Sequence, residues 1–257
     1  MADSTEGIKL KLGICLPWDS AFMFTKFVMS ALNLQHPEGY EVQWFSGHGW
    51  CPARRHADAC EQAIDAGADL LLILGADQTY PPDMLCRLVA RWEQVGGQGI
   101  IGAMVPMRGY VSWQGDLKPF QPLAWRSPDA WSDCAGTPAL IRREDGDFVR
   151  ANIIGTGVTL FHRDVFLSLK DPKFYEHVDP ETMHRVADMD STFVRRLQVE
   201  TGTPLYVDTT ILVGHCHVFE IDDTYAERFA DWADPATPGI DRTICRFRAE
   251  LPTTGGT

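Results

Sequence analysis

The sequence lacks several patterns that would assign a function directly. Its 7 cysteines are scattered over 257 residues without a C-x-x-C pair, so neither a zinc ribbon nor a thioredoxin-like site is indicated. It contains no P-loop and no serine-centred nucleophile elbow, and Gly155-Thr156-Gly157 is too short for a dinucleotide-binding fingerprint. The enzyme classes that these motifs define are therefore disfavoured.

Long apolar runs are also missing. No stretch approaches the length needed to span a membrane, and the N-terminus does not have the charged-then-apolar layout of a signal peptide. We therefore expect a cytoplasmic protein with reduced cysteines. The net charge of -12 argues against a surface built to hold bare nucleic acid, although a local basic patch is compatible with it.

Strands alternate with helices along the sequence. Apolar or alternating runs predict strands at 8–16, 40–45, 70–74, 99–105, 148–154, 158–161, 204–207 and 211–213. Helical patterns occur at 21–34, from 54 to the glycine at 67, and at 83–92, 164–169 and 188–197. This alternation predicts an α/β fold whose central sheet is mostly parallel and covered by helices on both faces.

The sequence predicts one main domain, residues 1–220, followed by a short C-terminal extension, 221–257, with a helix at 225–232. Residues 108–147 form an irregular insert rich in tryptophan, proline and glycine. This insert is too long for an ordinary connection, so we expect it to hold short strands or a functional loop.

Asp77 occupies the most informative position. The five apolar residues 70–74 form a run of buried-strand length, and Gly75-Ala76 separates them from the aspartate. Ligands of open α/β sheets bind at the carboxyl ends of the strands, so this carboxylate is a candidate ligand-binding group. The alternative is that Asp77 only caps a turn, as aspartate often does.

Further carboxylates and imidazoles stand at the ends of predicted elements, namely Asp188, Asp190, His215 and His217. Carboxylate oxygens suit Mg²⁺ or Mn²⁺, and Mn²⁺ also accepts an imidazole. A cysteine between the two histidines is compatible with zinc, but no second cluster stands at ligand spacing. Taken alone, either histidine is better explained as a surface or packed side chain.

Arg54 and Arg55 stand near the start of a predicted helix. Helix N-termini and guanidinium forks both favour anions, so the pair is a candidate phosphate contact. A solvated pair on an exposed turn is an equally good explanation of these two residues alone.

Four segments, taken in order, resemble the nucleotide-sugar glycosyltransferases of the GT-A fold, most closely the broad family 2 type. RRH followed by GAD, within 54–69, is similar to the family's "ARN…ALxxGAD" segment, and LLLILGADQTYPPDML, 70–85, looks like its strand ending in D-x-D with a following proline. Residues 155–166 are similar to its "GTG…RREVF" segment, and 190–215 to its "EDxxFxxR…G…VD…GH" stretch. The resemblance covers roughly residues 8–217.

The resemblance implies roles for particular residues. Asp77 matches the second Asp of D-x-D, which binds the metal that bridges the diphosphate; His215 matches a later metal-binding histidine, and His217 is a further candidate. The implied cofactor is Mn²⁺ or Mg²⁺, and the implied partner is a UDP- or GDP-sugar. Asp190 matches the general base of inverting members, with Asp188 as a second catalytic candidate. Nucleotide-sugar contacts are expected from Pro17, Asp19, Arg54, Arg55, Ala76, Asp77, Gly155 and Thr156.

The sequence departs from the family pattern at three positions. Gly75 stands where the first acid of D-x-D is usual, Met189 replaces the Glu of the "ED" pair, and His56 replaces the Asn. Asp188 is the nearest substitute for the missing Glu, although helical geometry puts Asp188 and Asp190 on different sides. These departures keep a non-catalytic nucleotide-sugar or glycan-binding module open. A nucleotidyltransferase is disfavoured, because no glycine-rich loop follows the first strand.

The sequence thus predicts a glycosyltransferase that moves a hexosyl or pentosyl group to an acceptor hydroxyl, with inversion slightly favoured. Residues 108–131 are the candidate acceptor wall, because aromatic faces suit sugars and bases. The acceptor itself stays open: a small molecule, a protein, a lipid head group or a hydroxylated DNA base. The acidic net charge weakens the DNA option, which would depend on a local patch around Arg142-Arg143 and Arg195-Arg196.

Overall fold

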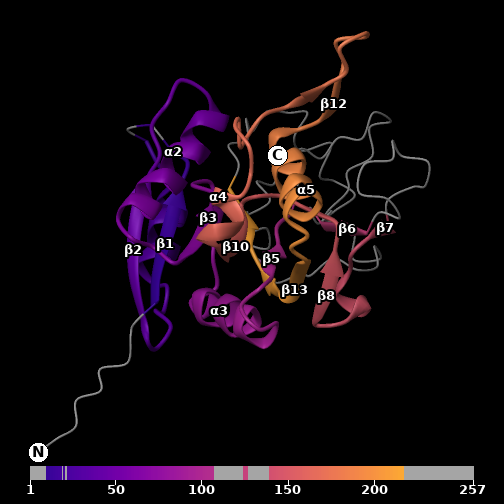
Figure 1. Cartoon of the computed structure of the whole chain (residues 1–257). Helices are drawn as coiled ribbons and strands as arrows, with labels where there is room; N and C mark the ends of the chain where they lie inside the picture. The colour runs from indigo at the N-terminus through magenta and orange to yellow at the C-terminus, as the bar shows by residue number, and fades with distance from the viewer. Residues whose placement is uncertain (1–9, 19, 21, 107–123, 127–138, 217–257) are drawn as a thin grey trace, which may run out of the picture. The chain divides into compact units, whose positions relative to one another are not determined.

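The computed structural model describes residues 10–18, 20, 22–106, 124–126 and 139–216 (Figure 1). All of these residues belong to one unit of the chain, which comprises 1–108 and 121–216. Asp19, His217, the expected helix at 225–232 and much of the 108–147 insert lie outside the described residues.

A seven-stranded sheet forms the centre of this unit, in the order β2-β1-β3-β10-β5-β13-β8. Strands β10 and β8 run antiparallel to their neighbours, and the others share one direction. The expected α/β fold with a mostly parallel sheet is therefore confirmed. The strands are β1 (Leu10–Leu16), β2 (Tyr40–Ser46), β3 (Leu70–Leu74), β5 (Ile100–Met104), β8 (Phe148–Ala151), β10 (Val158–His162) and β13 (Leu205–Leu212).

Helices cover both faces of the sheet, as the alternating pattern predicts. In β3, Leu71 and Ile73 belong to one hydrophobic core, and Leu70, Leu72 and Leu74 belong to the other. Both faces of this strand are buried, which explains its uninterrupted apolar run. The first core includes residues of α2 (Pro52–Asp65), α4 (Arg163–Leu167) and α5 (Met189–Thr201), and the second includes residues of α1 (Thr25–Leu32) and α3 (Met84–Gln94).

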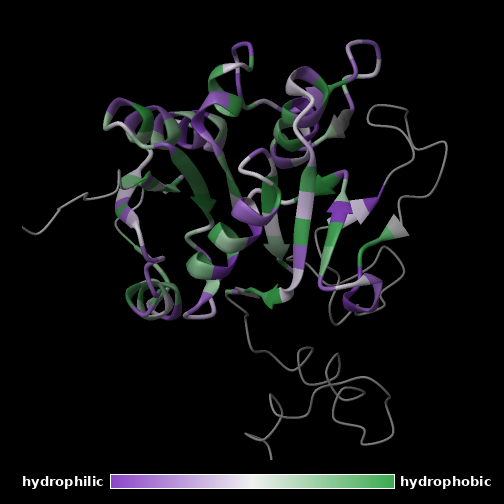
Figure 2. Cartoon of the chain, turned by 60° about the horizontal axis from the view of Figure 1, so that its bottom comes forward, coloured by the Kyte–Doolittle hydropathy of each residue, from purple (hydrophilic) through white to green (hydrophobic). Residues whose placement is uncertain are grey.

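The hydropathy of the chain follows this layering. The central strands are largely green in Figure 2, whereas the helices alternate between hydrophilic and hydrophobic residues. Such helices bury one stripe against the sheet and present the other to solvent. Among the residues that the structure describes, no helix has the length and apolar character needed to cross a bilayer.

Short elements complete the described part of the chain. β4 (Gln78–Thr79) pairs with β14 (Gly214–His215), and β11 (His177–Val178) pairs with β12 (Arg185–Ala187). A small sheet joins β6 (Ala124–Arg126) to β7 (Ala139–Leu140) and β9 (Ile153–Ile154), and a 3₁₀ turn spans Arg143–Asp145. Where it is described, the 108–147 insert therefore contains the expected short strands.

Helix α1 starts later than the expected residue 21. Phe24 is the residue before the helix, and Ser20 caps only a local turn, its hydroxyl accepting the Phe22 N–H at 3.3 Å. The Trp18 indole N–H donates to the Phe22 carbonyl at 2.9 Å, and both residues precede the helix. The loop after β1 is therefore longer than the sequence pattern suggested.

Two expected strand boundaries are wrong. The expected strands at 204–207 and 211–213 form one strand, β13 (Leu205–Leu212), that runs through Asp208. Conversely, the expected strand at 148–154 divides at Asn152, whose N–H donates to the Trp125 carbonyl at 2.9 Å, so β8 joins the main sheet and β9 the small one.

Asp208 is tolerated inside β13 because its carboxylate is fully engaged. The side chain is 1% exposed; Oδ2 accepts from Arg91 Nε at 2.8 Å, and Oδ1 accepts from the Thr210 N–H at 2.9 Å. Arg87 Nη2 approaches Oδ1 at 3.5 Å. Burial alone would raise the pKa of Asp208, but the Thr210 hydroxyl and the Arg91 guanidinium outweigh it, and the pKa is lowered. The aspartate thus ties helix α3 to the sheet.

Replacing Asp208 with asparagine is expected to lower the free energy of unfolding by about 2–4 kcal/mol at pH 7, because two partly buried arginines lose their counter-charge. A lowered pKa contributes stability that is present above the pKa of the unfolded chain and is lost as the pH falls through that of the folded protein. The difference between wild type and Asp208→Asn should therefore shrink below about pH 4. Urea unfolding from pH 3 to 7 measures it, and a constant difference across that range would contradict the assignment.

Candidate functional site

Asp77 and His215 meet at the carboxyl end of β3, although they lie far apart in the sequence. The chain returns after β13 and pairs β14 with β4 in antiparallel register, with His215 opposite Gln78. The Cys216 N–H also donates to the Asp77 carbonyl oxygen at 2.6 Å. This pairing brings His215 Nε2 to 3.4 Å from Asp77 Oδ2.

The orientation of the His215 ring is fixed from its other side. His215 Nδ1 lies 2.8 Å from the Pro106 carbonyl oxygen, which can only accept, so Nδ1 carries the hydrogen. In the neutral imidazole, Nε2 and the Asp77 oxygen therefore present lone pairs to each other, an arrangement in which a cation between them could bind to both.

These two ligands fit a divalent cation of the Mn²⁺ or Mg²⁺ type. Neighbouring ligands on an octahedron with bonds of about 2.1 Å lie roughly 3 Å apart, close to the observed 3.4 Å. Within the described part of the chain, no group of three His, Cys, Asp or Glu side chains could hold a metal. The described residues therefore supply a pair of ligands, a number typical of sites that bind Mg²⁺ together with phosphate oxygens.

Gly75, which stands where the D-x-D pattern would have its first aspartate, lies in a crowded position. A Cβ atom there would lie 2.8 Å from both Cδ and Nε2 of Gln78 and 3.2 Å from Asp77 Oδ1. A Cβ on Gly157 would lie 2.0 Å from Gln78 Nε2, and the Gly157 carbonyl accepts the Gly75 N–H at 2.9 Å. The Gln78 amide thus fills the space that side chains at these two glycines would require.

The candidate nucleotide-sugar residues near β1, β3 and β10 share this end of the sheet. Pro17 follows β1 and is half-buried, whereas Ala76 packs in the core beside Asp77. Gly155 and Thr156 are buried and precede β10, which runs antiparallel to β3, so they lie near the end of β3.

The two arginines of α2 already have protein partners. Arg54 forms ion pairs with Asp58 at 3.2 Å and Glu61 at 3.0 Å on its own helix. Arg55 Nε donates to the Gly49 carbonyl at 2.9 Å and so braces the loop between β2 and α2. Both arginines therefore have roles inside the fold that do not depend on a phosphate.

Asp188 and Asp190 have different environments at the start of α5. Asp188 is the N-cap residue, and its Oδ1 accepts the Ser191 N–H at 2.7 Å. Asp190 lies in the first turn, close to His56 of α2. Burial lowers the pKa of His56, and the Asp190 carboxylate partly opposes this shift. The helix cap thus occupies one oxygen of Asp188, whereas Asp190 lies beside His56.

Sequence reasoning missed Gln78 and Lys26. Burial and the Asp77 carboxylate raise the pKa of the Cys216 thiol, whereas the Lys26 ammonium of α1 lowers it. Lys26 belongs to a helix that is distant from Asp77 in the sequence, and Gln78 directly follows Asp77 at a position that the family pattern does not specify.

The expected basic patch is not formed as the sequence suggested. Arg196 is 4% exposed, and its guanidinium donates to the backbone carbonyls of Lys170, Pro172 and Lys173 and to Glu200. Arg142 pairs with Glu144 at 3.6 Å. Arg196 therefore cannot contribute to a nucleic-acid surface.

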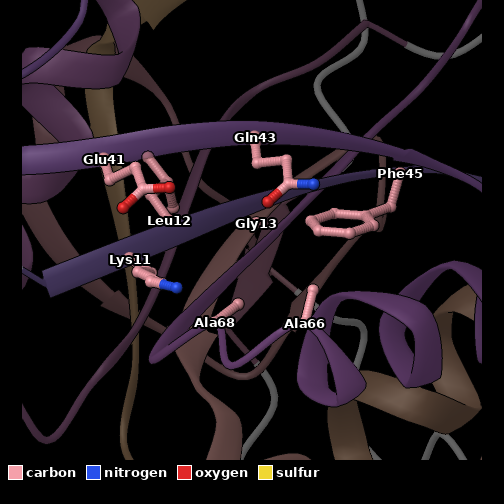
Figure 3. Close-up of a pocket in the computed structure, with 8 residues that line it drawn as sticks. All are labelled: Lys11, Leu12, Gly13, Glu41, Gln43, Phe45, Ala66 and Ala68. Atoms are coloured by element: carbon pink, nitrogen blue, oxygen red, sulfur yellow. The ribbon is translucent and has the colours of Figure 1, made fainter.

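A separate small hollow lies along β1 and β2 and beside the end of α2 (Figure 3). Its lining includes Lys11, Glu41, Gln43 and Ala66. It is far smaller than the roughly 300–1,000 Å³ of usual ligand pockets, and none of the candidate site residues lines it. It therefore carries no argument about function.

The comparisons with known proteins identify the type of fold, but they do not assign the chain to a family. No family model matches the sequence, and no curated protein matches it. Among solved structures, 216 chains match. "A197 from STIV" aligns with a TM-score of 0.50 at 13% identity, over 83% of this chain and 86% of that one. A structure of GalNAc-T7 with UDP, GalNAc and Mn²⁺ aligns with a TM-score of 0.53 at 12% identity, over 84% of this chain but 45% of that one.

The fold is therefore GT-A-like: a central, mostly parallel sheet flanked by helices, similar to that of a known glycosyltransferase. This chain spans less than half of the GalNAc-T7 chain that it matches. At 12–13% identity, the likeness establishes the fold alone.

The close approach of Gln78 to Gly157 gives a first test of the site's packing. Gly157→Ala is expected to lower the free energy of unfolding by about 1–3 kcal/mol, because the new methyl overlaps the Gln78 amide. Combined with Gln78→Ala, the substitution should cost much less, since the obstructing amide is gone. Urea unfolding of the two single variants and the double variant measures the coupling, and strictly additive effects would refute the contact.

Proposed function

We propose that this protein is a metal-dependent glycosyltransferase that moves a sugar from a nucleotide-diphosphate donor to an acceptor hydroxyl. One observation carries the proposal: a carboxylate and an imidazole, Asp77 and His215, face each other at 3.4 Å at the carboxyl end of a central strand. Open α/β sheets bind their ligands at this end. The GT-A-like fold supports the same interpretation.

The donor is a UDP- or GDP-sugar, and the cofactor is Mn²⁺ or Mg²⁺. The GalNAc-T7 structure was obtained with UDP, GalNAc and Mn²⁺, which supports this class of donor and metal by analogy. The mixed oxygen and nitrogen ligands favour Mn²⁺ over Mg²⁺. When bound, the cation would supply charge neutralisation for the departing nucleotide diphosphate.

The chain's own residues position and neutralise the donor. The Pro106 carbonyl holds the His215 ring with Nε2 toward Asp77, and the β4–β14 pair fixes the backbone of both residues. Lys26 adds a positive charge that acts on Cys216, the residue after His215, and would help to neutralise a bound diphosphate. Pro17, Gly155 and Thr156 would border the nucleotide sugar from the neighbouring strand ends.

Asp190 is the proposed general base. Asp190 lies in the first turn of α5, whereas Asp188 is the N-cap residue and accepts the Ser191 N–H. Asp190 would accept the proton of the acceptor hydroxyl as the oxygen attacks the anomeric carbon, which leads to inversion. His56 beside it keeps a lowered pKa and therefore stays neutral at pH 7.

Asp77→Ala is expected to abolish Mn²⁺-dependent hydrolysis of UDP- or GDP-sugars, lowering the rate by at least about 100-fold. His215→Ala should weaken Mn²⁺ binding in a direct titration. Asp83→Ala, which removes an exposed carboxylate from the same loop, is the matched control and should keep the wild-type rate. A wild-type hydrolysis rate no greater than that of Asp77→Ala would contradict the proposal that the protein is an enzyme.

Asp190→Asn is expected to lower sugar transfer by about 10²–10⁴-fold while the melting temperature stays near that of the wild type. Asp188→Ala should instead cost about 1 kcal/mol of stability through the lost helix cap. Single-turnover rates and thermal melts of both variants separate the two roles. A larger loss of rate in Asp188→Ala than in Asp190→Asn would reverse the assignment.

A non-catalytic nucleotide-sugar-binding module is the second candidate. Glycine at position 75 favours it, because the described residues then offer a single carboxylate at the metal. Mn²⁺-dependent binding of the nucleotide sugar without any hydrolysis or transfer would select this alternative.

A further inference from the structure

Gln78 is buried beside Asp77 with an unmet hydrogen-bonding group. Its side chain is 4% exposed, and its amide oxygen Oε1 has no hydrogen-bond partner among the described residues. Buried amides are almost always paired, because an unmet polar atom keeps the full cost of leaving water. Such an atom in a native fold therefore requires an explanation.

The backbone is arranged to admit this amide. The amide lies where Cβ atoms of Gly75 and Gly157 would be, so glycine at both positions gives it room. The residue next to it in sequence is Asp77, and the residue opposite it across the β4–β14 pair is His215. A purely structural filler at this position would need no amide, since an apolar side chain of similar size would fill the space without the unmet oxygen.

The two carboxylate oxygens of Asp77 have different neighbours. Oδ2 faces His215 Nε2 at 3.4 Å, whereas Oδ1 lies 3.2 Å from the Cβ position of Gly75, which the Gln78 amide also borders. A cation held between Asp77 and His215 would occupy the Oδ2 side. The Gln78 amide borders the Oδ1 side and offers a neutral acceptor there.

We propose that Gln78 is a donor-binding residue whose Oε1 accepts a hydrogen bond from a hydroxyl group of the bound nucleotide sugar, on the Oδ1 side of Asp77. An amide oxygen can only accept, so its partner must carry a hydrogen, and the hydroxyls of the ribose and of the sugar are the hydrogen-bearing groups nearest to the diphosphate, whereas the base N–H groups lie farther from it. The last torsion of a glutamine is soft, so the amide can turn toward the ligand without movement of β4. This inference rests on the proposed function.

Gln78→Met tests the assignment, because it keeps the size of the side chain and removes the oxygen. We expect Gln78→Met to bind UDP or GDP, or their sugars, about 3- to 10-fold more weakly in the presence of Mn²⁺. Its melting temperature should equal or exceed that of the wild type, since an unpaired buried polar atom is gone. Its affinity for Mn²⁺ alone should be unchanged. A residue with only a structural role would not combine weaker binding with undiminished stability.

Gln198→Met is the matched control. Gln198 is a partly buried glutamine of α5 whose Nε2 donates to the Asn152 carbonyl at 2.6 Å, away from Asp77. It should lose stability and keep the wild-type affinity for the nucleotide, the opposite pattern to Gln78→Met.

Deoxy analogues identify the hydroxyl and keep the test independent of how the variant folds. Loss of affinity for 2′-deoxyuridine diphosphate relative to UDP, in wild type but not in Gln78→Met, assigns a ribose hydroxyl. The same pattern seen only with deoxy-sugar donors assigns a hydroxyl of the sugar.

Isothermal titration of wild type and variant distinguishes the outcomes. Equal nucleotide affinity in wild type and Gln78→Met, or no preference of the wild type for any hydroxyl, overturns the role of Gln78 and leaves the proposed function standing. A wild type that binds no Mn²⁺–nucleotide complex overturns both.

Discussion

The candidate site depends on a single return of the chain, the pairing of β14 with β4. These two short strands join the end of β13 to the loop after β3, and they bring His215 to Asp77. Each strand has only two residues, so their own hydrogen bonds stabilise them little. The site is held because its supports, β3 and β13, are long central strands buried in the sheet.

Buried charges away from the site stabilise those supports. Asp208 ties β13 to α3 through Arg91, and Arg196 of α5 binds the backbone carbonyls of the 170–173 loop. Both charges lie inside the protein with their hydrogen-bonding groups engaged, which is the condition under which buried ions are tolerated. The carboxyl end of the sheet can then carry an unsatisfied group, the Gln78 amide oxygen.

The glycine at position 75 has a steric cause in the fold. Strand β10 enters the sheet antiparallel to β3, so Gly157 lies against Gly75 and the Gln78 amide fits over both. An acid at position 75 would meet that amide. The glycine at the first position of D-x-D and the buried Gln78 amide therefore occur together. For this reason, the lack of an acid at position 75 does not by itself argue against ligand binding at Asp77.

The sequence alone determined the fold class and the position of Asp77, because a strand buried on both faces requires a continuous apolar run and leaves its first polar residue at the sheet edge. It did not determine that β13 is one strand, because the neutralisation of Asp208 by Arg87 and Arg91 depends on where α3 packs. Nor could local pattern bring His215 to Asp77, or His56 to Asp190. Those positions follow from strand order and helix packing, which join residues that are distant in sequence and leave no periodic signal.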